Sequence, residues 1–475
     1  MKPLFRRRWR RGAALVVIAV VSLLLLAMSA LAVDLGFLYS VEADLQATCD
    51  ASALAAASAL SISEDEVRAR ARQYAAKNRV NGEAVKLLDD DVEFGTWDSA
   101  TRTFTPIVPS PSVRATAVRV RAELSQGRGT GVGLFFAPIL GFGAADVSAR
   151  STAVFGTRDV MLAFDMSASM NNDSELSAVE RLGKAAVEGI ILGMYRDLGS
   201  PEYGNLTFDP VVISPTSTQQ IIEALGLDTE PYPYPSGSWT EYVGFVQTDS
   251  GVASAGRRNH YGYLTLIDYW QRLRYKAAET PDLWRTREQP LTAVKDSVDL
   301  FLAYLSQCRT DDRVGLVVYN SSNGTAELEV SLTDDYEQVS AAARRKQAGH
   351  YHEYTNIAAG ISKSREEMLT RGRHSALRLI VQLSDGKANW LGTYNPSAAK
   401  TAALAQAQAA AQEGIQIVTI SLGSDADTEL MQEIADITGG VHFVVPAGGS
   451  VEEYADELDA VFGQIAAHRR LRLVD

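Results

Sequence analysis

The sequence has 475 residues, which is more than one ordinary hydrophobic core accommodates, so we expect roughly two to four folded units. Its formal net charge of -13 at pH 7 argues against a nucleic-acid partner, because affinity for phosphate backbones comes mainly from clustered Lys and Arg. The two cysteines, Cys49 and Cys308, lie in segments that we assign to different domains. They therefore form neither a disulfide framework nor a cysteine-rich zinc site, and we expect both to be small apolar fillers.

Residues 1–33 have the pattern of a membrane anchor. Basic residues crowd the segment 1–12, and no charged residue follows until Asp34. The segment 13–33 is uncharged and mostly apolar, and its length is close to the ~20 residues that cross a bilayer as a helix. The positive-inside rule keeps the basic segment in the cytoplasm. We therefore expect a single-pass protein of the bacterial inner membrane whose carboxyl-terminal part is periplasmic or extracellular.

A cleaved signal peptide is the alternative interpretation of this segment. Ala30-Leu31-Ala32 has the small-x-small pattern that signal peptidase favours, and cleavage there would begin the mature chain at Val33. The apolar run is longer than the core of an ordinary signal peptide. We therefore favour an anchor that is retained.

The segment that follows the span predicts a helical stalk and then strands. Apolar residues recur at intervals of three and four within 34–80, which is typical of amphipathic helices. Ser63 followed by Glu66 forms a capping box, so a second helix should begin there. Alternating side chains in 81–157 predict a small strand-rich domain. We expect this domain to be a structural spacer without chemistry.

The segment 158–475 alternates apolar runs with helical patterns, which predicts an α/β fold with a doubly wound, mostly parallel, Rossmann-like sheet. We expect strands at 159–164, 313–319, 326–332, 378–384, 415–421 and 441–445. We expect helices at 290–307, 355–369, 396–413, 425–437 and 450–467. In such sheets ligands bind at the carboxyl ends of the strands.

A large insertion, 172–289, separates the first strand from the first of these helices. It holds nine of the 18 tyrosines and three of the six tryptophans, an enrichment that argues against disorder. A turn cluster at 231–237 and a helix around 264–275 are expected inside it. We interpret it as a folded subdomain. Its aromatic side chains favour a role in partner binding, although half of them could form its own core.

Two strand ends carry the residues of a candidate metal site. The first strand runs directly into Asp165, with Ser167 and Ser169 close behind, and another ends at Asp385. Hard cations such as Mg²⁺ prefer oxygen ligands, so two strand-end carboxylates and nearby hydroxyls suit one ion. We expect Asp165 to face solvent at its strand end. Gly386 should let the chain turn away sharply after the acid.

The segments DMSAS at 165–169, TNIAAG at 355–360 and LSDG at 383–386 resemble, in order, the three loops of the metal-ion-dependent adhesion site of von Willebrand factor A domains. The resemblance implies a divalent cation, Mg²⁺ first, with Mn²⁺ or Ca²⁺ as alternatives. It implies direct binding by Ser167 and Ser169, mainly water-mediated binding by Asp165 and Asp385, and binding by Thr355 directly or through water. An acidic group of a partner protein would take the sixth place.

Two positions depart from the pattern of that family. Ala168 stands where glycine is frequent, which is a minor change. The segment His352-Glu353-Tyr354 precedes Thr355 where a pair of glycines is common. Glu353 could therefore crowd the site or supplement it.

The front of the chain carries a second resemblance. The basic run, the apolar span and the segments 33–39 and 45–57 are similar to the amino-terminal region of TadG-type proteins of Flp (tight-adherence) pilus assembly, which commonly end in an A-type domain. Pilus-assembly components are therefore expected among the partners. Related pseudopilins have a glutamate five residues into the processed chain, but a cut at Gly12 would place Val17 there. We do not expect prepilin-type processing.

These patterns together predict a non-enzymatic, membrane-anchored protein that binds a partner through the metal, in Flp pilus assembly or in cell adhesion. One alternative is a structural envelope protein whose metal only stabilises the sheet. Another is a metal-dependent hydrolase, but the sequence has no HExxH, GxSxG or phosphate-binding glycine loop. His350 and His352 are the candidate catalytic pair, and two histidines in a loop are more often ordinary surface residues.

Overall fold

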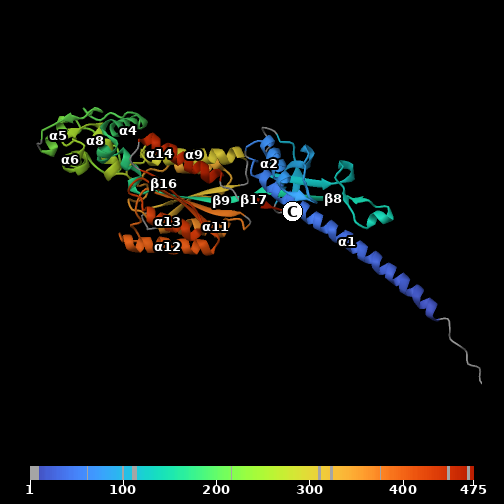
Figure 1. Ribbon diagram of the computed structural model, residues 1–475. Coiled ribbons are helices and arrows are strands. Elements are labelled where there is room, and N and C mark those ends of the chain that lie inside the picture. The colour runs from blue at the N-terminus through green and yellow to red at the C-terminus, as the bar shows by residue number, and fades with distance from the viewer. Residues whose placement is uncertain are drawn as a thin grey trace, which may run out of the picture. The chain divides into compact units, whose positions relative to one another are not determined.

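The computed structural model (Figure 1) divides the chain into two compact units, residues 1–156 with 469–475, and residues 157–468. The structure describes residues 10–60, 62–98, 101–109, 115–214, 217–308, 312–320, 325–374, 376–446, 450–467 and 471–474. Most of the predicted cytoplasmic segment 1–12 and the side chain of Cys308 lie outside the described part.

Helix α1 (Arg10–Ala57) contains the predicted membrane span. Its side chains from Ala14 to Ser29 are exposed, and its most apolar window has a mean hydropathy of 2.9. By length and composition it can cross a membrane, as can no other helix in the part of the chain that the structure describes. The helix continues through Ala30–Ala32 without a break, so the span and the stalk are one element.

The outer half of α1 and helix α2 (Glu64–Lys77) pack in one core with the strands of the first unit. Ser63 caps α2 as predicted, because its hydroxyl accepts the Glu66 N–H at 3.2 Å. Cys49 is a buried filler whose thiol donates to the Ala149 carbonyl, and burial raises its pKa to about 12. The stalk is therefore not a free-standing rod, because its apolar stripe is covered by the sheet.

The sheet of the first unit is antiparallel, in the order β17-β8-β5-β3-β4. Its strands are β3 (Val92–Asp98), β4 (Thr103–Pro106), β5 (Ala117–Leu124), β8 (Val147–Phe155) and β17 (Leu471–Leu473). Short pairs are β1 (Arg79–Val80) with β2 (Glu83–Ala84), and β6 (Val132–Gly133) with β7 (Ala144–Ala145). Three 3₁₀ turns are η1 (Asp89–Asp91), η2 (Gln126–Arg128) and η3 (Ala137–Leu140).

The carboxyl terminus corrects one predicted boundary. The segment 158–475 was expected to form one domain, but β17 pairs with β8 and residues 469–475 belong to the first unit. The physical reason is that β8 would otherwise present an open edge, and Leu471 and Leu473 pack against the apolar core of that unit. Three residues of alternating pattern are too short to reveal this pairing from sequence.

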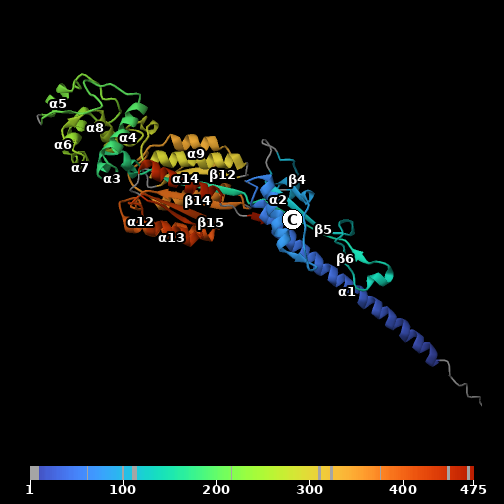
Figure 2. The ribbon, with the colours of Figure 1, turned by 45° about the horizontal axis from the view of Figure 1, so that its top comes forward.

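The second unit contains the predicted α/β fold (Figure 2). Its sheet has the order β13-β12-β9-β14-β15-β16, and every neighbouring pair is parallel except β12 with β13. The strands are β9 (Arg158–Asp165), β12 (Arg313–Tyr319), β13 (Ala326–Thr333), β14 (Leu377–Ser384), β15 (Ile415–Leu422) and β16 (His442–Val445). The central strand β9 is buried along its whole length, which explains its continuous apolar run.

Helices cover both faces of this sheet, as expected for a doubly wound fold. One face carries α9 (Leu291–Cys308), α10 (Tyr336–Arg344) and α14 (Val451–Ala467). The other carries α11 (Ile357–Arg371), α12 (Pro396–Gln412) and α13 (Thr428–Thr438). The sequence reading missed α10, whose nine residues show only two buried positions, Val339 and Ala343.

The insertion 172–289 has a hydrophobic core of its own. It begins within η4 (Ala168–Ser174), and its elements are η5 (Leu176–Ala178), α3 (Val179–Leu182), α4 (Lys184–Asp197), α5 (Thr218–Ala224), α6 (Trp239–Thr248), α7 (Ser250–Ser254), α8 (Tyr263–Leu273), η6 (Leu283–Arg285) and the pair β10 (Val211–Val212) with β11 (His260–Tyr261). Much of its aromatic content is buried, including Tyr242, Tyr261, Tyr269 and Trp270. Those side chains build the core of the insertion and are not available to a partner.

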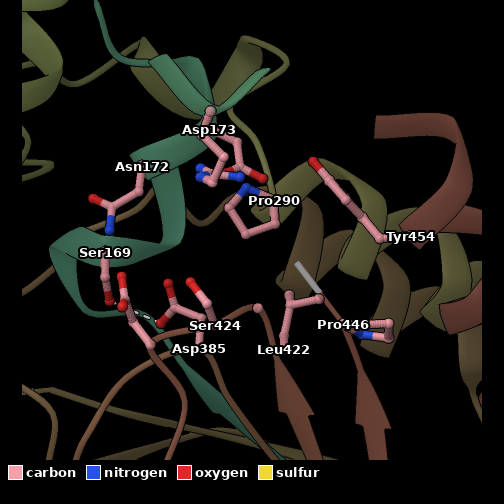
Figure 3. Close-up of a pocket in the computed structure, with 12 residues that line it drawn as sticks. Ser169, Asn172, Asp173, Pro290, Asp385, Leu422, Ser424, Pro446 and Tyr454 are labelled. Atoms are coloured by element: carbon pink, nitrogen blue, oxygen red, sulfur yellow. Dashed lines mark hydrogen bonds and ion pairs between the residues drawn. The ribbon is translucent and has the colours of Figure 1, made fainter. Parts of the chain in front are cut away.

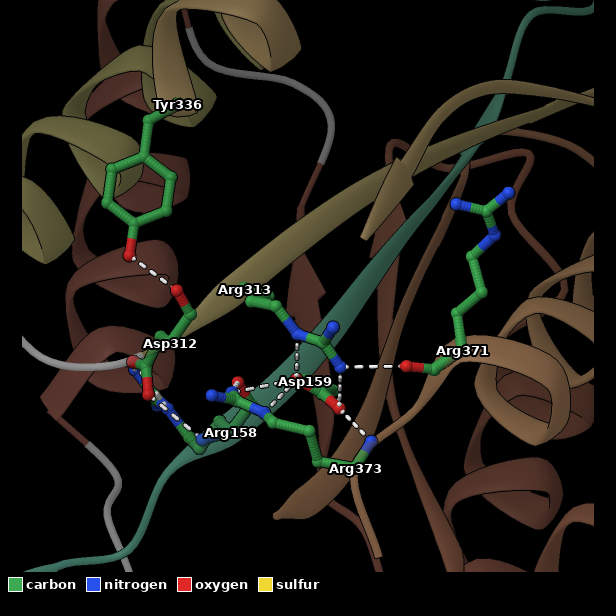
Figure 4. A network of polar contacts seen from close by, with 7 residues as sticks. All are labelled: Arg158, Asp159, Asp312, Arg313, Tyr336, Arg371 and Arg373. Carbon is green, nitrogen blue, oxygen red and sulfur yellow. Dashed lines mark hydrogen bonds and ion pairs between the residues drawn. The ribbon is translucent and has the colours of Figure 1, made fainter. Parts of the chain in front are cut away.

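Ion pairs fix the amino end of β9, opposite to the candidate metal site (Figure 4). Arg158 and Asp312 are fully buried and lie 2.8 Å apart, and Arg158 also donates to the Ile465 carbonyl. Asp159 accepts from Arg313 and Arg373, each at 2.8 Å. Burial alone would raise the pKa of Asp159, but these hydrogen bonds outweigh it and the pKa is lowered. The start of the central strand is thereby tied to β12 and to the loop before β14.

We predict that Asp312→Ala lowers the free energy of unfolding of the second unit by about 3–5 kcal/mol, because it leaves the Arg158 guanidinium buried without its carboxylate. Urea unfolding of the purified chain, followed by tryptophan fluorescence, measures the loss. The control is Glu366→Ala, which breaks an exposed pair with Lys363 and should change little. Equal unfolding midpoints for wild type and Asp312→Ala would contradict the structural role of this pair.

Candidate metal centre

The five predicted site residues all lie at the carboxyl edge of the second sheet. Asp165 is the last residue of β9, Ser167 follows it, and Ser169 lies in η4. Asp385 comes directly after β14, which is the immediate neighbour of β9. Thr355 lies two residues before α11. Because parallel strands end at the same edge, loops that are far apart in sequence meet here.

A chain of hydrogen bonds joins four of these residues. Asp165 accepts the Ser167 N–H at 2.9 Å, and the Ser167 and Ser169 hydroxyl oxygens are 3.0 Å apart. The Ser169 hydroxyl then donates to Asp385 at 2.8 Å, and Figure 3 shows these two side chains facing each other. The two carboxylates are therefore linked through Ser167, by its backbone N–H and its hydroxyl, and through the Ser169 hydroxyl.

Gly386 brings Thr355 into the same group. A methyl group at Gly386 would lie 3.3 Å from the Thr355 hydroxyl oxygen and 3.5 Å from that of Ser169. The chain does bend at Asp385 and Gly386, as expected, but Gly386 does not have a positive φ, so the bend itself does not require glycine. Glycine instead leaves room beside two hydroxyl oxygens that a side chain would crowd.

Both aspartates are buried, and this corrects the prediction that Asp165 faces solvent. Asp165 is fully buried and Asp385 is 7% exposed. Within the described residues neither forms a salt bridge, and burial raises the pKa of Asp165 to about 6. Burial and the charge of Asp165 raise the pKa of Asp385 well above its usual value. The loops bury Asp165 because they fold back over the strand end.

The donor set fits a small hard cation. It consists of two carboxylates and three hydroxyls, all oxygen, and it has no thiol or imidazole that would favour a softer metal. Among the described residues there is no group of three or more His, Cys, Asp or Glu that could hold a metal. Any metal held here would therefore depend on hydroxyls as much as on carboxylates.

Three polar residues that the sequence reading missed support the site. The Ser384 hydroxyl donates to Asp165 at 2.6 Å, and Asn389 accepts the Thr355 N–H at 2.9 Å. Asn320 donates to the carbonyls of Met166 and His352, which ties the first two loops together. Ser384 and Asn320 both stand at strand ends on this edge, so the rule that identified Asp165 could also have found them.

The loop before Thr355 contacts the first metal loop and the insertion. The N–H of Ala168 donates to the Glu353 carbonyl at 3.2 Å. The Glu353 carboxylate accepts the hydroxyl of Tyr275, which belongs to the insertion, at 3.0 Å. Glu353 therefore ties the insertion to this loop.

The same loop holds the two candidate histidines, His350 and His352. Burial lowers the pKa of His350 to about 4 and also lowers the pKa of His352.

An aromatic cluster borders the site and was not predicted. Tyr354 and Trp390 stack with ring centroids 4.4 Å apart and an interplanar angle of 6°. His352 and Tyr394 flank this pair at 5.4 Å from Trp390 and 5.9 Å from Tyr354. Tyr394 is 64% exposed. The backbone N–H of Trp390 donates to the Thr355 carbonyl. We call these four residues the rim cluster.

The insertion also reaches the metal edge directly. A small cavity of about 70 Å³ is lined by Ser169 and Asp385 and by three residues of the insertion, Asn172, Asp173 and Arg181 (Figure 3). Arg181 forms an ion pair with Asp173 and is partly exposed. The insertion therefore flanks the site on the side of the cavity.

Comparisons with known families agree with both resemblances. The model of the von Willebrand factor type A domain matches residues 284–457. The family model of Tad-like Flp pilus-assembly proteins matches residues 46–153, and that of TadE/G-like Flp pilus-assembly proteins matches residues 12–59. The type A match begins near the end of the insertion, so strand β9 and Asp165 lie outside the matched residues. Strand β9 nevertheless belongs to the same six-stranded sheet as the matched strands, between β12 and β14. Comparison with curated proteins gives no match.

Several solved structures are similar to this chain. One is an aerotolerance-related membrane protein from Bacteroides fragilis, with 18% identity over 37% of this chain and 90% of that one, TM-score 0.29. Another is an uncharacterized membrane spanning protein from Vibrio fischeri, with 28% identity over 37% and 84%, TM-score 0.15. A third is the manganese-loaded TRAP protein from Plasmodium vivax, with 12% identity over 68% and 78%, TM-score 0.29.

The family matches cover the front of the chain and the sheet of the second unit. Regions of Tad type occupy the span, the stalk and the first sheet, and the type A match covers the helices and strands after the insertion. The chain therefore combines front regions that match the Tad-like and TadE/G-like Flp pilus-assembly families with a carboxyl-terminal domain that matches the von Willebrand factor type A family.

Proposed function

We propose that this membrane-anchored protein binds a partner protein through a divalent cation held by Asp165, Ser167, Ser169, Thr355 and Asp385, in pilus assembly or adhesion. One observation carries the proposal: two buried carboxylates lie at adjacent strand ends, linked by hydroxyls and without a salt bridge among the described residues. Burying such charges without compensation is unfavourable. A bound Mg²⁺ would compensate both of them, with Mn²⁺ or Ca²⁺ as alternatives.

The division of roles follows from the positions of the residues. Asp165 and Asp385 supply the charge, whereas Ser167, Ser169 and Thr355 supply neutral oxygens. A cation held by these residues would attract an acidic group of a partner. Arg181, on the cavity beside Asp385, is placed to attract the same group. Aromatic residues dominate binding hot spots, so the rim cluster is the surface that we assign to the partner.

A non-enzymatic role is part of this proposal. His350 hydrogen-bonds with the backbone of Gln347 and has a lowered pKa, and His352 packs in the rim cluster. Neither forms a hydrogen bond with Asp165 or Asp385 within the described residues. Hydrolase assays with and without Mn²⁺ separate this proposal from a metal-dependent hydrolase.

We further propose that the second unit lies outside the cytoplasm and that the anchor is retained. A reporter fused after Asp475 should be active only outside the cytoplasm, because the basic segment 1–12 holds the other end inside. Amino-terminal sequencing of the membrane fraction should find Met1 to Ala32 still present. Cytoplasmic reporter activity would contradict the orientation, and a mature terminus at Val33 would contradict retention.

We predict that Asp165→Asn and Asp385→Asn each weaken Mg²⁺ binding at least ~100-fold, because each removes one of the two charges that balance the cation. Titration calorimetry measures the affinity. Ser167→Ala removes only a neutral ligand that water can replace, so its loss should be smaller. Asparagine keeps the size of the side chain, which suits positions as buried as these.

Thermal melting distinguishes the loss of metal from the loss of folding. In chelator both aspartate variants should melt at or above the wild-type temperature, because a buried and unpaired charge has been removed. Mg²⁺ should raise the melting temperature of wild type alone. Equal Mg²⁺ affinity in wild type and both variants would refute the metal site.

We predict that partner capture requires both the metal and the rim cluster. Wild-type protein should capture an envelope partner in Mg²⁺ and lose it in chelator, whereas Trp390→Ala should capture several-fold less at unchanged Mg²⁺ affinity. Leu300→Ala, at an exposed position of α9, is the matched control. Metal-dependent melting without metal-dependent capture would instead favour a structural role for the cation.

We also propose that the insertion helps to set specificity. Deleting it would leave the Glu353 carboxylate without Tyr275, so a point variant is the cleaner test. Arg181→Gln should weaken capture without changing Mg²⁺ affinity, since Arg181 borders the cavity and is not a predicted ligand. Capture equal to wild type would place recognition on the rim cluster alone.

A further inference from the structure

We propose that residues 134–143, which we call the apolar loop, form a second membrane contact that enters the lipid leaflet beside α1. The loop joins β6 to β7 and reads LFFAPILGFG, and no charged residue occurs in the longer segment 129–145. This proposal concerns the first unit and is independent of the metal site.

The apolar loop exposes an unusual amount of apolar surface. Its exposed side chains are Phe135 at 62%, Phe136 at 43%, Ile139 at 83%, Leu140 at 78% and Phe142 at 67%. Single exposed apolar residues are ordinary, but a contiguous group of this size marks an interaction site. Aromatic and aliphatic side chains in a segment without charged residues of its own suit hydrocarbon better than a hydrated protein surface.

Asp34 attaches the apolar loop to the end of the membrane span. Its buried carboxylate accepts the N–H groups of Phe135 at 2.8 Å, Phe136 at 3.1 Å and Ala137 at 2.7 Å. The Phe135 ring also packs edge-on against Phe37 of α1, at 5.0 Å between centroids. Asp34 is the first charged residue after the apolar stretch, so these bonds hold the loop at the level where α1 leaves the bilayer.

The apolar loop extends toward the membrane-spanning part of α1. Both ribbon views show the teal segment around β6 projecting from the five-stranded sheet alongside α1, toward its amino-terminal part (Figures 1 and 2). Ala30 is half-buried, whereas α1 is exposed from Ala14 to Ser29. The exposed Leu31, Val33 and Leu35 continue the apolar surface along the helix. The loop and the span therefore present one apolar zone.

The backbone of the apolar loop is suited to a lipid environment, where an unsatisfied N–H is costly. Besides the three N–H groups bound by Asp34, those of Leu134, Ile139, Gly141 and Phe142 donate to carbonyls within the loop. Pro138 has no N–H to satisfy.

The occupant that these observations favour is the bilayer rather than a protein. The loop is continuous with a helix that is apolar enough to cross a membrane, and a lipid-facing side chain needs no specific partner. Two attachment points, α1 and the apolar loop, would fix the orientation of the first unit at the surface. A second copy or a pilus component covering the loop is the competing outcome.

The test uses the full chain with its two cysteines replaced by alanine and Ile139→Cys carrying an environment-sensitive fluorophore. The protein is reconstituted in vesicles of phosphatidylethanolamine and phosphatidylglycerol. The matched control is Val108→Cys, which is 89% exposed in the same unit. The label at 139 should show blue-shifted emission and lose most of its intensity to a lipid-borne quencher, while iodide should quench it several-fold less than the label at 108.

Equal iodide quenching at both positions, without quenching by lipid, would overturn the proposal. Protection from iodide without quenching by lipid would also overturn it, because a protein would then cover the loop. Circular dichroism identical to wild type shows that the labelled chain is folded. Asp34→Ala should reduce the lipid quenching at 139, because it removes the acceptor of three loop N–H groups.

Discussion

The closeness of two like charges at the edge of the second sheet is the constraint on which the candidate site depends. Asp165 and Asp385 are neighbours because β9 and β14 are adjacent parallel strands that end together. The hydroxyls of Ser167 and Ser169 connect them, and Gly386 leaves room beside the hydroxyl oxygens of Ser169 and Thr355. The arrangement is strained in electrostatic terms without a cation, so metal binding and the stability of this edge are expected to be coupled.

The same edge explains how the chain tolerates so large an insertion. The insertion leaves just after the first metal loop and returns where the N–H of Asp173 donates to the Gln289 carbonyl at 3.0 Å, so its two ends are joined. The central strand stays fixed because Arg158 and Asp159 anchor its other end. Tyr275 then ties the insertion to the loop before Thr355. An insertion in this position can alter the approach to the metal without disturbing the sheet.

Sequence reasoning could predict the sheet, most of its helices and the five clustered site residues, because continuous apolar runs and strand-end aspartates are local patterns. It could not predict features that depend on distant partners. The pairing of β17 with β8 places Leu473 opposite Ala153, about 320 positions away in the sequence. The stacking of Tyr354 on Trp390 needs the folded loops, and the burial of Asp165 follows from loops that fold over it. In each case the prediction would have needed contacts between segments that are far apart in the sequence.

Two buried aspartates elsewhere in the chain, Asp34 and Asp159, differ from Asp165 and Asp385. Asp34 is satisfied by three backbone N–H groups, and Asp159 by two arginines, so neither needs a cation from outside. Asp165 and Asp385 receive hydroxyls and one backbone N–H from the neighbouring loops, which is weaker compensation for two charges. The protein can clearly neutralise a buried carboxylate with its own groups where structure alone is required. At this edge two weakly compensated carboxylates are instead connected through Ser167 and Ser169, and this pairing is the physical reason to assign them to a bound cation.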